Sequence, residues 1–450
     1  MKAGKGSAST VASGEMWHEE TEAARTCRQF HDRVRPTQLP ERRAALAEFL
    51  ESYYRDRLRI VPTPEESQAL HDLTQPDVLA VEIGHDGQLP HLGIVRMVLK
   101  AHDIASRDTR ALTLYAIGTH YTARSRPRNV HFGMPLEGRP PEEVGEPPKV
   151  LIGQENGKRP FWSIPPPKPP ELRALEAQLQ AFVGHNVAHE RKAGNVVTPD
   201  RKALALHRLA EVFQLLVRCA EDVSNFGEWL VRVQHDLFRW LLGDEAGRIL
   251  FLPMAEVVPL MRDDLRTIAA SSRVVARIKS EAARERHAGS SGHDLATEAT
   301  GPFWLYCPSC LRRGRSAWSA ETLIPFRCPN CGHTAELDGA NPWPWLAPDV
   351  VSFQAALFQF GVAGWVVGSR ASYLPVVDRV ATEVFRREPP PRFLLRSTPM
   401  FRGLGDPPSG YGRTRLLRAL LDIEPRQLAH ALRAPWNEDP RIVGDLLRTP

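Results

Sequence analysis

An apolar segment, a glycine-containing loop, a helical pattern and a second apolar segment follow one another between residues 78 and 118. This order constrains the fold more than any other feature of the chain. The segments 78–83 and 111–117 are mostly apolar and rich in β-branched residues, which predicts two buried strands. Between them, apolar residues recur at helical spacing from 94 to 102. A strand–helix–strand unit implies a parallel sheet with a right-handed crossover. We therefore predict an α/β protein built around a parallel sheet.

Three histidines follow the two predicted strands. His85 and His91 lie in the loop that ends the first strand, and His120 comes directly after the second. Ligands of parallel sheets bind beyond the carboxyl ends of the strands, and a helix that begins there directs free N–H groups at anions. We therefore expect His85, His91 and His120 to be catalytic residues. The structural alternative is that they cap the helix and fill the loop.

Two Cys-x-x-Cys pairs form the most specific chemical motif of the chain. Cys307 and Cys310 are separated by seventeen residues from Cys328 and Cys331, which is the spacing of a zinc ribbon. The apolar segments at 303–306 and 323–326 predict the strands of the ribbon hairpin. Four thiolates complete a tetrahedron, so this zinc would stabilise the fold without binding substrate. A redox-active dithiol pair is the alternative.

The 450 residues divide into five predicted parts. Residues 1–15 are small and polar, and we expect a disordered tail. Residues 16–170 contain the first part of a Rossmann-like core and end in a proline-rich excursion. Residues 171–300 are helical, residues 301–340 form the zinc ribbon, and residues 341–450 contain the second part of the α/β core and C-terminal helices.

The helical part carries a long apolar repeat. Apolar residues keep a three–four spacing from 200 to 242, which predicts one long helix with coiled-coil-like packing. Its expected partner is the helical pattern at 257–286. Residues 248–253, between the two, predict another short buried strand.

Two glycines of the second core part are candidates for cofactor binding. Gly364 and Gly368 lie in an apolar segment, where a missing side chain allows close approach of a ligand to the backbone. Ordinary turn chemistry is the alternative.

Composition excludes several classes of protein. Hydrophobic residues make up 42% and charged residues 25%, as in soluble globular proteins. No apolar run reaches the length of a membrane span, and residues 1–15 lack the apolar core of a signal peptide. Cysteines in Cys-x-x-Cys pairs are typical of metal binding in a reducing compartment. We therefore expect a cytoplasmic protein with no membrane partner. The oligomeric state stays open, a homodimer included.

Two patches of the chain carry a resemblance to a known family. Residues 84–93 read Gly-His-Asp-Gly-Gln-Leu-Pro-His-Leu-Gly, which is similar to the segment G-H-Q-P-x-L-x-H-x-G. Residues 373–378, followed by the prolines at 389–391 and Arg-Ser-Thr at 396–398, are similar to a Y-D-x-x-T-D helix and an S-A-T segment. In this order and separation, the patches resemble proteins related to the bacillithiol cysteine-adding enzyme over roughly residues 75–400.

The resemblance implies a Rossmann-like core akin to class I aminoacyl-tRNA synthetases, with an inserted helical coiled coil. It also implies a reaction that joins cysteine or a similar amino acid to an amine-bearing small molecule through an activated carboxylate. ATP is the cofactor implied by this chemistry. The zinc ribbon is an addition to the family pattern.

The same resemblance implies which residues line the nucleotide and substrate pocket. These are Gly84, His85, His91 and Gly93 on one wall, with Tyr373 and Asp378 binding substrate on the far wall. Asp86 and Gly87 replace the Gln-Pro of the family, and Ile94 stands where class I synthetases have the last His of their H-x-G-H signature. A role without ATP therefore stays open.

Two functions are compatible with these features. The first is a carboxylate–amine ligase that acts on small-molecule amine and amino-acid substrates. The second is a non-catalytic zinc-ribbon protein that binds nucleic acid such as tRNA, with Trp304, Tyr306 and Trp318 stacking on bases. A net charge of +5 is low for a nucleic-acid binder of this length, which favours the ligase.

Overall fold

The computed structural model describes the residues 20–35, 38–86, 92–120, 129–131, 149–151, 159–192, 199–286, 303–314, 323–338, 345–368 and 373–395. Among them lie eleven α-helices: α1 Glu20–Arg33, α2 Leu39–Ser52, α3 Pro64–Thr74, α4 Leu92–Ser106, α6 Pro169–Lys192, α7 Pro199–Asp222, α8 Phe226–Leu242, α9 Arg262–Ala270, α10 Ser272–Arg286, α11 Val350–Leu357 and α12 Leu374–Glu383. The strands are β1 Leu79–Asp86, β2 Ala111–Gly118, β3 Asn129–His131, β4 Lys149–Leu151, β5 Ile249–Pro253, β6 Phe303–Tyr306, β7 Arg313–Gly314, β8 Leu323–Arg327, β9 Thr334–Asp338, β10 Leu346–Pro348, β11 Val362–Gly368 and β12 Arg392–Leu395. The expected tail at 1–15, most of the proline-rich excursion and the expected C-terminal helices lie outside the described residues.

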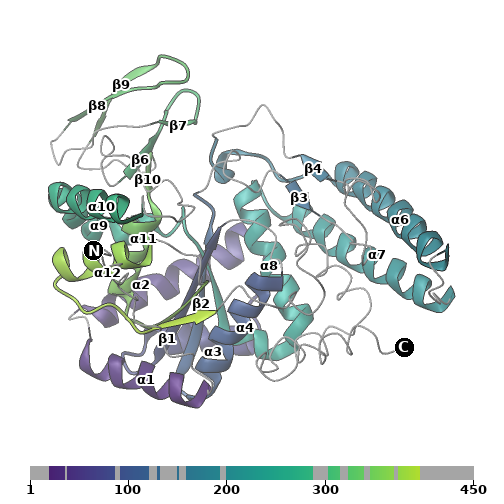
Figure 1. The fold of residues 1–450 in the computed structure, drawn as a ribbon, viewed down its shortest axis with the longest axis horizontal. Helices are drawn as coiled ribbons and strands as arrows, with labels where there is room; N and C mark the ends of the chain where they lie inside the picture. Colours follow the sequence, from purple (N-terminus) through teal and green to yellow (C-terminus); the bar gives the residue numbers. More distant parts are fainter. Residues whose placement is uncertain are drawn as a thin grey trace, which may run out of the picture.

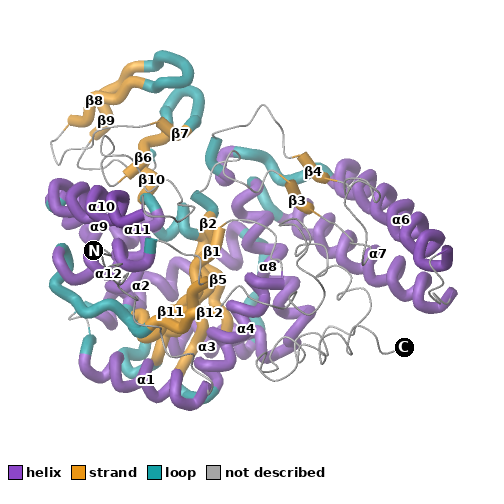
Figure 2. The backbone as a smooth tube through the Cα atoms, in the orientation of Figure 1, coloured by secondary structure: helices purple, strands orange, loops and turns teal. Residues whose placement is uncertain are grey.

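A five-stranded parallel sheet forms the centre of the molecule, as the sequence predicted (Figure 2). Its strand order is β12–β11–β1–β2–β5, and every neighbouring pair is parallel. Numbered along the chain, this order is 5-4-1-2-3, so the connections run in opposite directions on the two sides of β1. In open α/β sheets, a ligand crevice forms where the order reverses, beyond the carboxyl ends of the two central strands. Here these strands are β1 and β11.

Helices cover both faces of this sheet (Figure 1). On one face, α4 packs on β1, β2 and β11, α1 packs on β11, and α8 packs on β5. On the other face, α11 packs against α12, and its Gln354 reaches β1. Because both faces are covered, β2 and β5 are buried along their whole length. Exposed backbone is therefore confined to the edges of the sheet.

The prediction of one long helix over 200–242 is wrong. The chain forms α7 and α8 instead, with a break at residues 223–225. Asn225 has extended backbone (φ −148°, ψ 169°), and its side chain accepts a hydrogen bond from the Glu228 N–H at 2.9 Å, which caps a new helix. The partner of α7 also differs from the expectation: α6 lies beside it, and 257–286 is divided into η5 (Val258–Met261), α9 and α10 (Figure 1). A coiled coil is not seen among the described helices.

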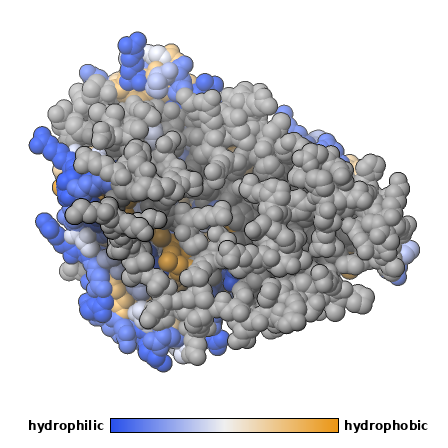
Figure 3. Space-filling view, viewed as in Figure 1, coloured by the Kyte–Doolittle hydropathy of each residue, from blue (hydrophilic) through white to orange (hydrophobic). Residues whose placement is uncertain are grey.

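Polar residues gather on the outer helices. On the described part of the face in Figure 3, hydrophilic side chains lie over α1, α10 and α12. Ion pairs link two of these helices, among them Arg379 with Glu281 at 2.6 Å. Among the described residues, no helix is both long and apolar enough to cross a membrane.

The amino edge of the sheet is held by one buried arginine. Arg43 of α2 donates to the carbonyls of Gln75 (3.0 Å) and Val78 (2.7 Å), just before β1. It also donates to the carbonyls of Phe360 (3.1 Å) and Gly361 (3.0 Å), just before β11. Four backbone carbonyls thus obtain partners that the strands themselves cannot supply.

We expect Arg43→Met to lower the free energy of unfolding by at least ~3 kcal/mol, because it removes the Arg43 donors from the buried carbonyls of Val78, Phe360 and Gly361. Urea denaturation followed by circular dichroism measures the change. Arg55→Met is the matched control, since the Arg55 side chain is 60% exposed and its loss should cost at most about 0.5 kcal/mol. Equal midpoints for the two variants would contradict the role of Arg43.

Candidate metal centre and sheet-edge site

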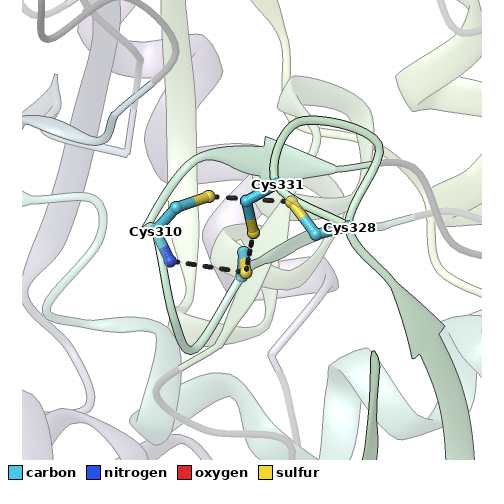
Figure 4. A group of neighbouring side chains, drawn as sticks. Cys310, Cys328 and Cys331 are labelled. Atoms are coloured by element: carbon cyan, nitrogen blue, oxygen red, sulfur yellow. Dashed lines mark hydrogen bonds between the residues drawn. The ribbon is translucent and has the colours of Figure 1, made fainter. Parts of the chain in front are cut away.

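Four cysteine side chains converge beside the strands β6 to β9 (Figure 4). The Sγ atoms of Cys307, Cys310, Cys328 and Cys331 all lie within 4.8 Å of one another. The Cys307–Cys331 distance is 3.7 Å and the Cys310–Cys328 distance is 3.6 Å. Four sulfurs that each lie 2.3 Å from one ion, at the corners of a tetrahedron, are about 3.8 Å apart. The predicted set of four cysteines can therefore hold a metal ion such as zinc.

Both Cys-x-x-Cys pairs form the same tight turn. The carbonyl of the first cysteine accepts from the N–H four residues later, Leu311 at 2.9 Å and Gly332 at 3.0 Å. Both of these residues have positive φ, 57° and 74°. The Sγ of the first cysteine accepts from the N–H two residues later, Ser309 and Asn330, at 3.4 Å in each pair. These N–H groups favour the thiolate form that a metal ion requires.

The predicted ribbon hairpin differs from the observed pairing. The segments at 303–306 and 323–327 are strands, but they do not pair with each other. β6 lies between β10 and β7, whereas β8 pairs with β9. Each cysteine pair thus begins at the end of a strand that belongs to its own small sheet.

The described residues of 303–338, which we call the metal-binding module, contact the carboxyl edge of the central sheet. Tyr306, the residue before Cys307, is buried, and its hydroxyl donates to the carbonyl of His120, just beyond β2. The Tyr306 ring also packs edge-on against Trp162, with 5.7 Å between ring centroids. Tyr306 is therefore not available to stack on a base, contrary to the nucleic-acid interpretation. Trp318 lies outside the described residues.

A buried carboxyl group lies near the carboxyl end of β1. Glu82 has no exposed surface, and its Oε2 accepts from Gln354 Nε2 at 2.8 Å. Among the described residues, none is a hydrogen-bond partner of its Oε1. Next along the same face of β1 is Gly84, where a Cβ atom would lie 3.0 Å from Glu82 Oε1, 3.5 Å from Gln354 Oε1 and 3.4 Å from Met254 Cε. The bare backbone of Gly84 thus borders the free oxygen of Glu82.

Burial determines the protonation of Glu82. It raises the pKa of Glu82 to about 8, and the hydrogen bond from Gln354 opposes this shift only in part. At neutral pH the group is therefore mostly a neutral carboxylic acid. It can donate its proton or, once ionised, accept hydrogen bonds.

His120 lies on the same side of the edge as Glu82. Its ring stacks on Phe353, with 6.0 Å between centroids and 15° between planes, and Phe353 precedes Gln354 on α11. His85 ends β1 beside Ile117 of β2. Because side chains alternate along a strand, His85 points to the α4 face, opposite to Glu82 and Gly84. The structure thus separates two of the predicted catalytic histidines, and His91 lies outside the described residues.

The three other predicted cofactor glycines differ in surroundings. A Cβ at Gly364 would overlap Cys27 Sγ of α1 and lie 3.0 Å from the Phe393 ring, so helix packing requires this glycine. Among the described residues, a Cβ at Gly368, at the carboxyl end of β11, would meet only Met97 Sδ, at 4.0 Å. Gly368 and Gly93, which lies in the first turn of α4, are therefore at the carboxyl edge of the sheet.

The two predicted substrate residues, Tyr373 and Asp378, lie directly before α12 and within it, on different sides of the helix axis. Tyr373 immediately precedes α12, and its ring lies 6.5 Å from that of Trp365 on β11. Asp378 is five residues further on, about 140° around the helix. It forms an ion pair with Arg392 of β12 at 2.7 Å, and burial raises its pKa. Tyr373 is thus the nearer of the two to the edge.

A second polar cluster lies beyond β2 and β5. Thr119 Oγ1 donates to Glu256 Oε2 at 2.7 Å and accepts from the Ala255 N–H at 2.8 Å. Glu256 Oε1 has no partner within the described parts of the chain, and burial raises the pKa of the Glu256 carboxyl group. Glu228, which is completely buried, binds Arg57 at 2.7 Å. This cluster links the first turn of α8 to the ends of two strands.

Glu82 and Glu256 were not identified from the sequence. The signal for Glu82 was its position within an otherwise apolar strand of a parallel sheet. Such a strand is covered on both faces, so its one acidic residue must be buried. No sequence pattern points to Glu256, because its importance follows only from its contact with Thr119, a residue 137 positions earlier in the chain.

Comparisons with known proteins identify no relatives of this chain: no family model matches it, and no curated protein is significantly similar to it.

We expect protein purified without added metal to carry about one equivalent of zinc, and Cys328→Ser to release it. Loss of the ion should expose residues 303–338 to protease, because so small a module cannot be held by apolar burial alone. Elemental analysis and limited proteolysis measure both effects, with the exposed Ser309→Ala as the control that retains zinc. Less than half an equivalent of metal together with four reactive thiols would refute the site.

We also expect Glu82 to make stability depend on pH. The pKa of Glu82 is about 8 in the folded chain and near 4.5 in the unfolded chain. The contribution of this group to stability is therefore fully present below about pH 4.5 and is lost as the pH rises through 8. Between these limits the loss is ~1.4 kcal/mol per pH unit. Urea titrations from pH 5 to 9 should show a smaller decline for Glu82→Gln than for the wild type. Parallel declines would show that Glu82 is ionised throughout.

Proposed function

We propose that this protein is an ATP-using carboxylate–amine ligase with a Rossmann-like core, and that it joins cysteine or a similar amino acid to a small-molecule amine. The observation that carries the proposal is the reversal of strand order between β1 and β11. Doubly wound sheets bind nucleotides at such a reversal. The resemblance of residues 84–93 and 373–378 to the cysteine-adding family supplies the reaction.

Two features of the edge support a nucleotide there. Gly368 leaves open space at the end of β11, and the loop after β1 leads to the first turn of α4, where N–H groups are free to bind an anion. ATP, when bound, supplies the leaving group that activates the carboxylate. We propose that His85 hydrogen-bonds the phosphates and that His91 and Gly93 complete this side of the pocket.

The remaining candidate residues are assigned to the substrates. We propose that His120 and Tyr373 contact them and that Asp378 maintains the pocket wall through Arg392. Charge stabilisation by such groups typically contributes a few kcal/mol to a reaction barrier. The metal is proposed to be zinc with a structural role, and the α6–α7 pair is the proposed counterpart of the family's coiled coil. Nucleic acid is not a proposed partner, since Tyr306 is buried.

ATP binding is tested by calorimetry on two glycine variants of the same strand. We expect Gly368→Val to weaken ATP binding at least tenfold with little change in melting temperature, because its side chain extends into the edge without a clash. Gly364→Ala is the matched control. It should lower the melting temperature through the overlap with Cys27, while the ATP affinity of the folded protein stays unchanged.

The chemistry is tested by ATP–pyrophosphate exchange with each of the twenty amino acids. We expect one of them, with a side chain like that of cysteine, to stimulate exchange in the wild type but not in Gly368→Val. Absence of ATP binding by the wild type, or equal affinity of the two glycine variants, would overturn the nucleotide site. ATP binding without stimulation by any amino acid would overturn the ligase reaction alone.

A further inference from the structure

The polar environment of Glu82 is incomplete in a way that points to a ligand. A carboxyl group that is fully buried normally has partners for both oxygens, and an unpaired buried polar atom costs about 1–3 kcal/mol. Oε2 of Glu82 is held by Gln354, whereas Oε1 has no partner in the part of the chain that the structure describes. The two residues come from β1 and α11, which are 272 residues apart in the chain. This pair therefore fixes one oxygen in place and leaves the other free.

Gly84 provides the approach to the free oxygen. The place where a Cβ would stand at residue 84 is bordered by Glu82 Oε1 at 3.0 Å and Gln354 Oε1 at 3.5 Å. Met254, beyond the end of β5, forms the apolar side of the same space. Gly84 itself is half-buried, unlike Glu82. A group that enters from the carboxyl edge over Gly84 thus meets two oxygen acceptors.

The chemistry of this space selects an N–H donor. The amide N–H of Gln354 is already directed at Glu82 Oε2, so the atoms that border Gly84 are oxygens and one methyl group. An ammonium group has three donors and no acceptor. We propose that Glu82, with Gln354, binds the α-amino group of the amino-acid substrate over Gly84. The inference rests on the proposed function, in which an amino acid is one of the two substrates.

Binding of this kind includes a proton balance. At pH 7 the amine in solution is an ammonium ion and Glu82 holds a proton. When the ammonium enters, the carboxyl group loses its proton to solvent, and the product is a carboxylate–ammonium ion pair. Among the described residues, the elements around Glu82 present Gln354 from α11, Met254 after β5, Leu114 from β2 and Trp365 from β11, none of them charged. The released proton therefore comes from Glu82.

The proton release is measured by titration calorimetry at pH 7 in two buffers of different ionisation enthalpy. The probes are L-cysteine and 3-mercaptopropionate, which is the same molecule without its amine, followed by the other nineteen amino acids. For the wild type we expect about one proton released per bound amino acid and none for the deaminated analogue. Glu82→Gln should abolish the release and weaken binding of the amino acid at least tenfold, with no effect on the analogue.

Gly84→Ala provides a second variant that leaves Glu82 in place. Its methyl group would lie about 3.0 Å from Oε1, and it should block the amino acid while circular dichroism stays unchanged. Failure of every amino acid to bind, or an unchanged proton release in Glu82→Gln, would overturn the proposal. The outcome is separate from that of the ligase, because amine binding with proton release but without ATP binding would retain the amine site and remove the ligase.

Discussion

The cover of helices on both faces of the parallel sheet is the constraint on which the rest of the structure depends. It buries β2 and β5 along their whole length, and all the side chains of these strands except those of Thr113 and Tyr115 lack polar atoms. It also leaves the strand ends as the places where a ligand can meet the sheet. The order of the strands reverses between β1 and β11, and in open α/β sheets the ligand crevice lies at such a reversal, beyond the carboxyl ends of the two strands.

Two buried polar side chains, Arg43 and Glu82, lie at opposite ends of this sheet and differ in how far their hydrogen-bonding groups are satisfied. At the amino edge, Arg43 directs four of its five N–H donors at carbonyls before β1 and β11. Towards the carboxyl edge, Glu82 is equally buried, but one of its oxygens has no partner among the residues that the structure describes. Satisfied polar groups make a core rigid and specific, whereas an unsatisfied one carries a cost that a bound ligand or water can offset.

The sequence was sufficient where a local pattern determines the outcome. The strands at 78–83, 111–117 and 249–253 and the parallel sheet follow from apolar runs and the crossover, and the four cysteines follow from their spacing. It was insufficient where a contact between distant residues decides. Residue 364 must be glycine because a Cβ there would overlap Cys27, which lies 337 residues earlier. The local sequence suggested a cofactor-binding glycine, because this distant packing contact leaves no local pattern. The break before α8 depends on the cap that Asn225 forms, and the apolar repeat continues through it. Whether His85, His120, Tyr373 and Asp378 act on a ligand is a property of the bound state, which no spacing specifies.

The metal-binding module is connected to the candidate site through a short path. Cys307 would be fixed by the ion, and the preceding Tyr306 is buried between Trp162 and the backbone of His120. His120 in turn stacks on Phe353, the neighbour of Gln354, which positions Glu82. A metal ion bound by the cysteines would thus stabilise more than these small sheets, because release of Tyr306 would remove the donor that holds the carbonyl of His120 at the sheet edge. The four cysteines have no open position for chemistry, yet they bear on the geometry of the edge where a ligand would bind.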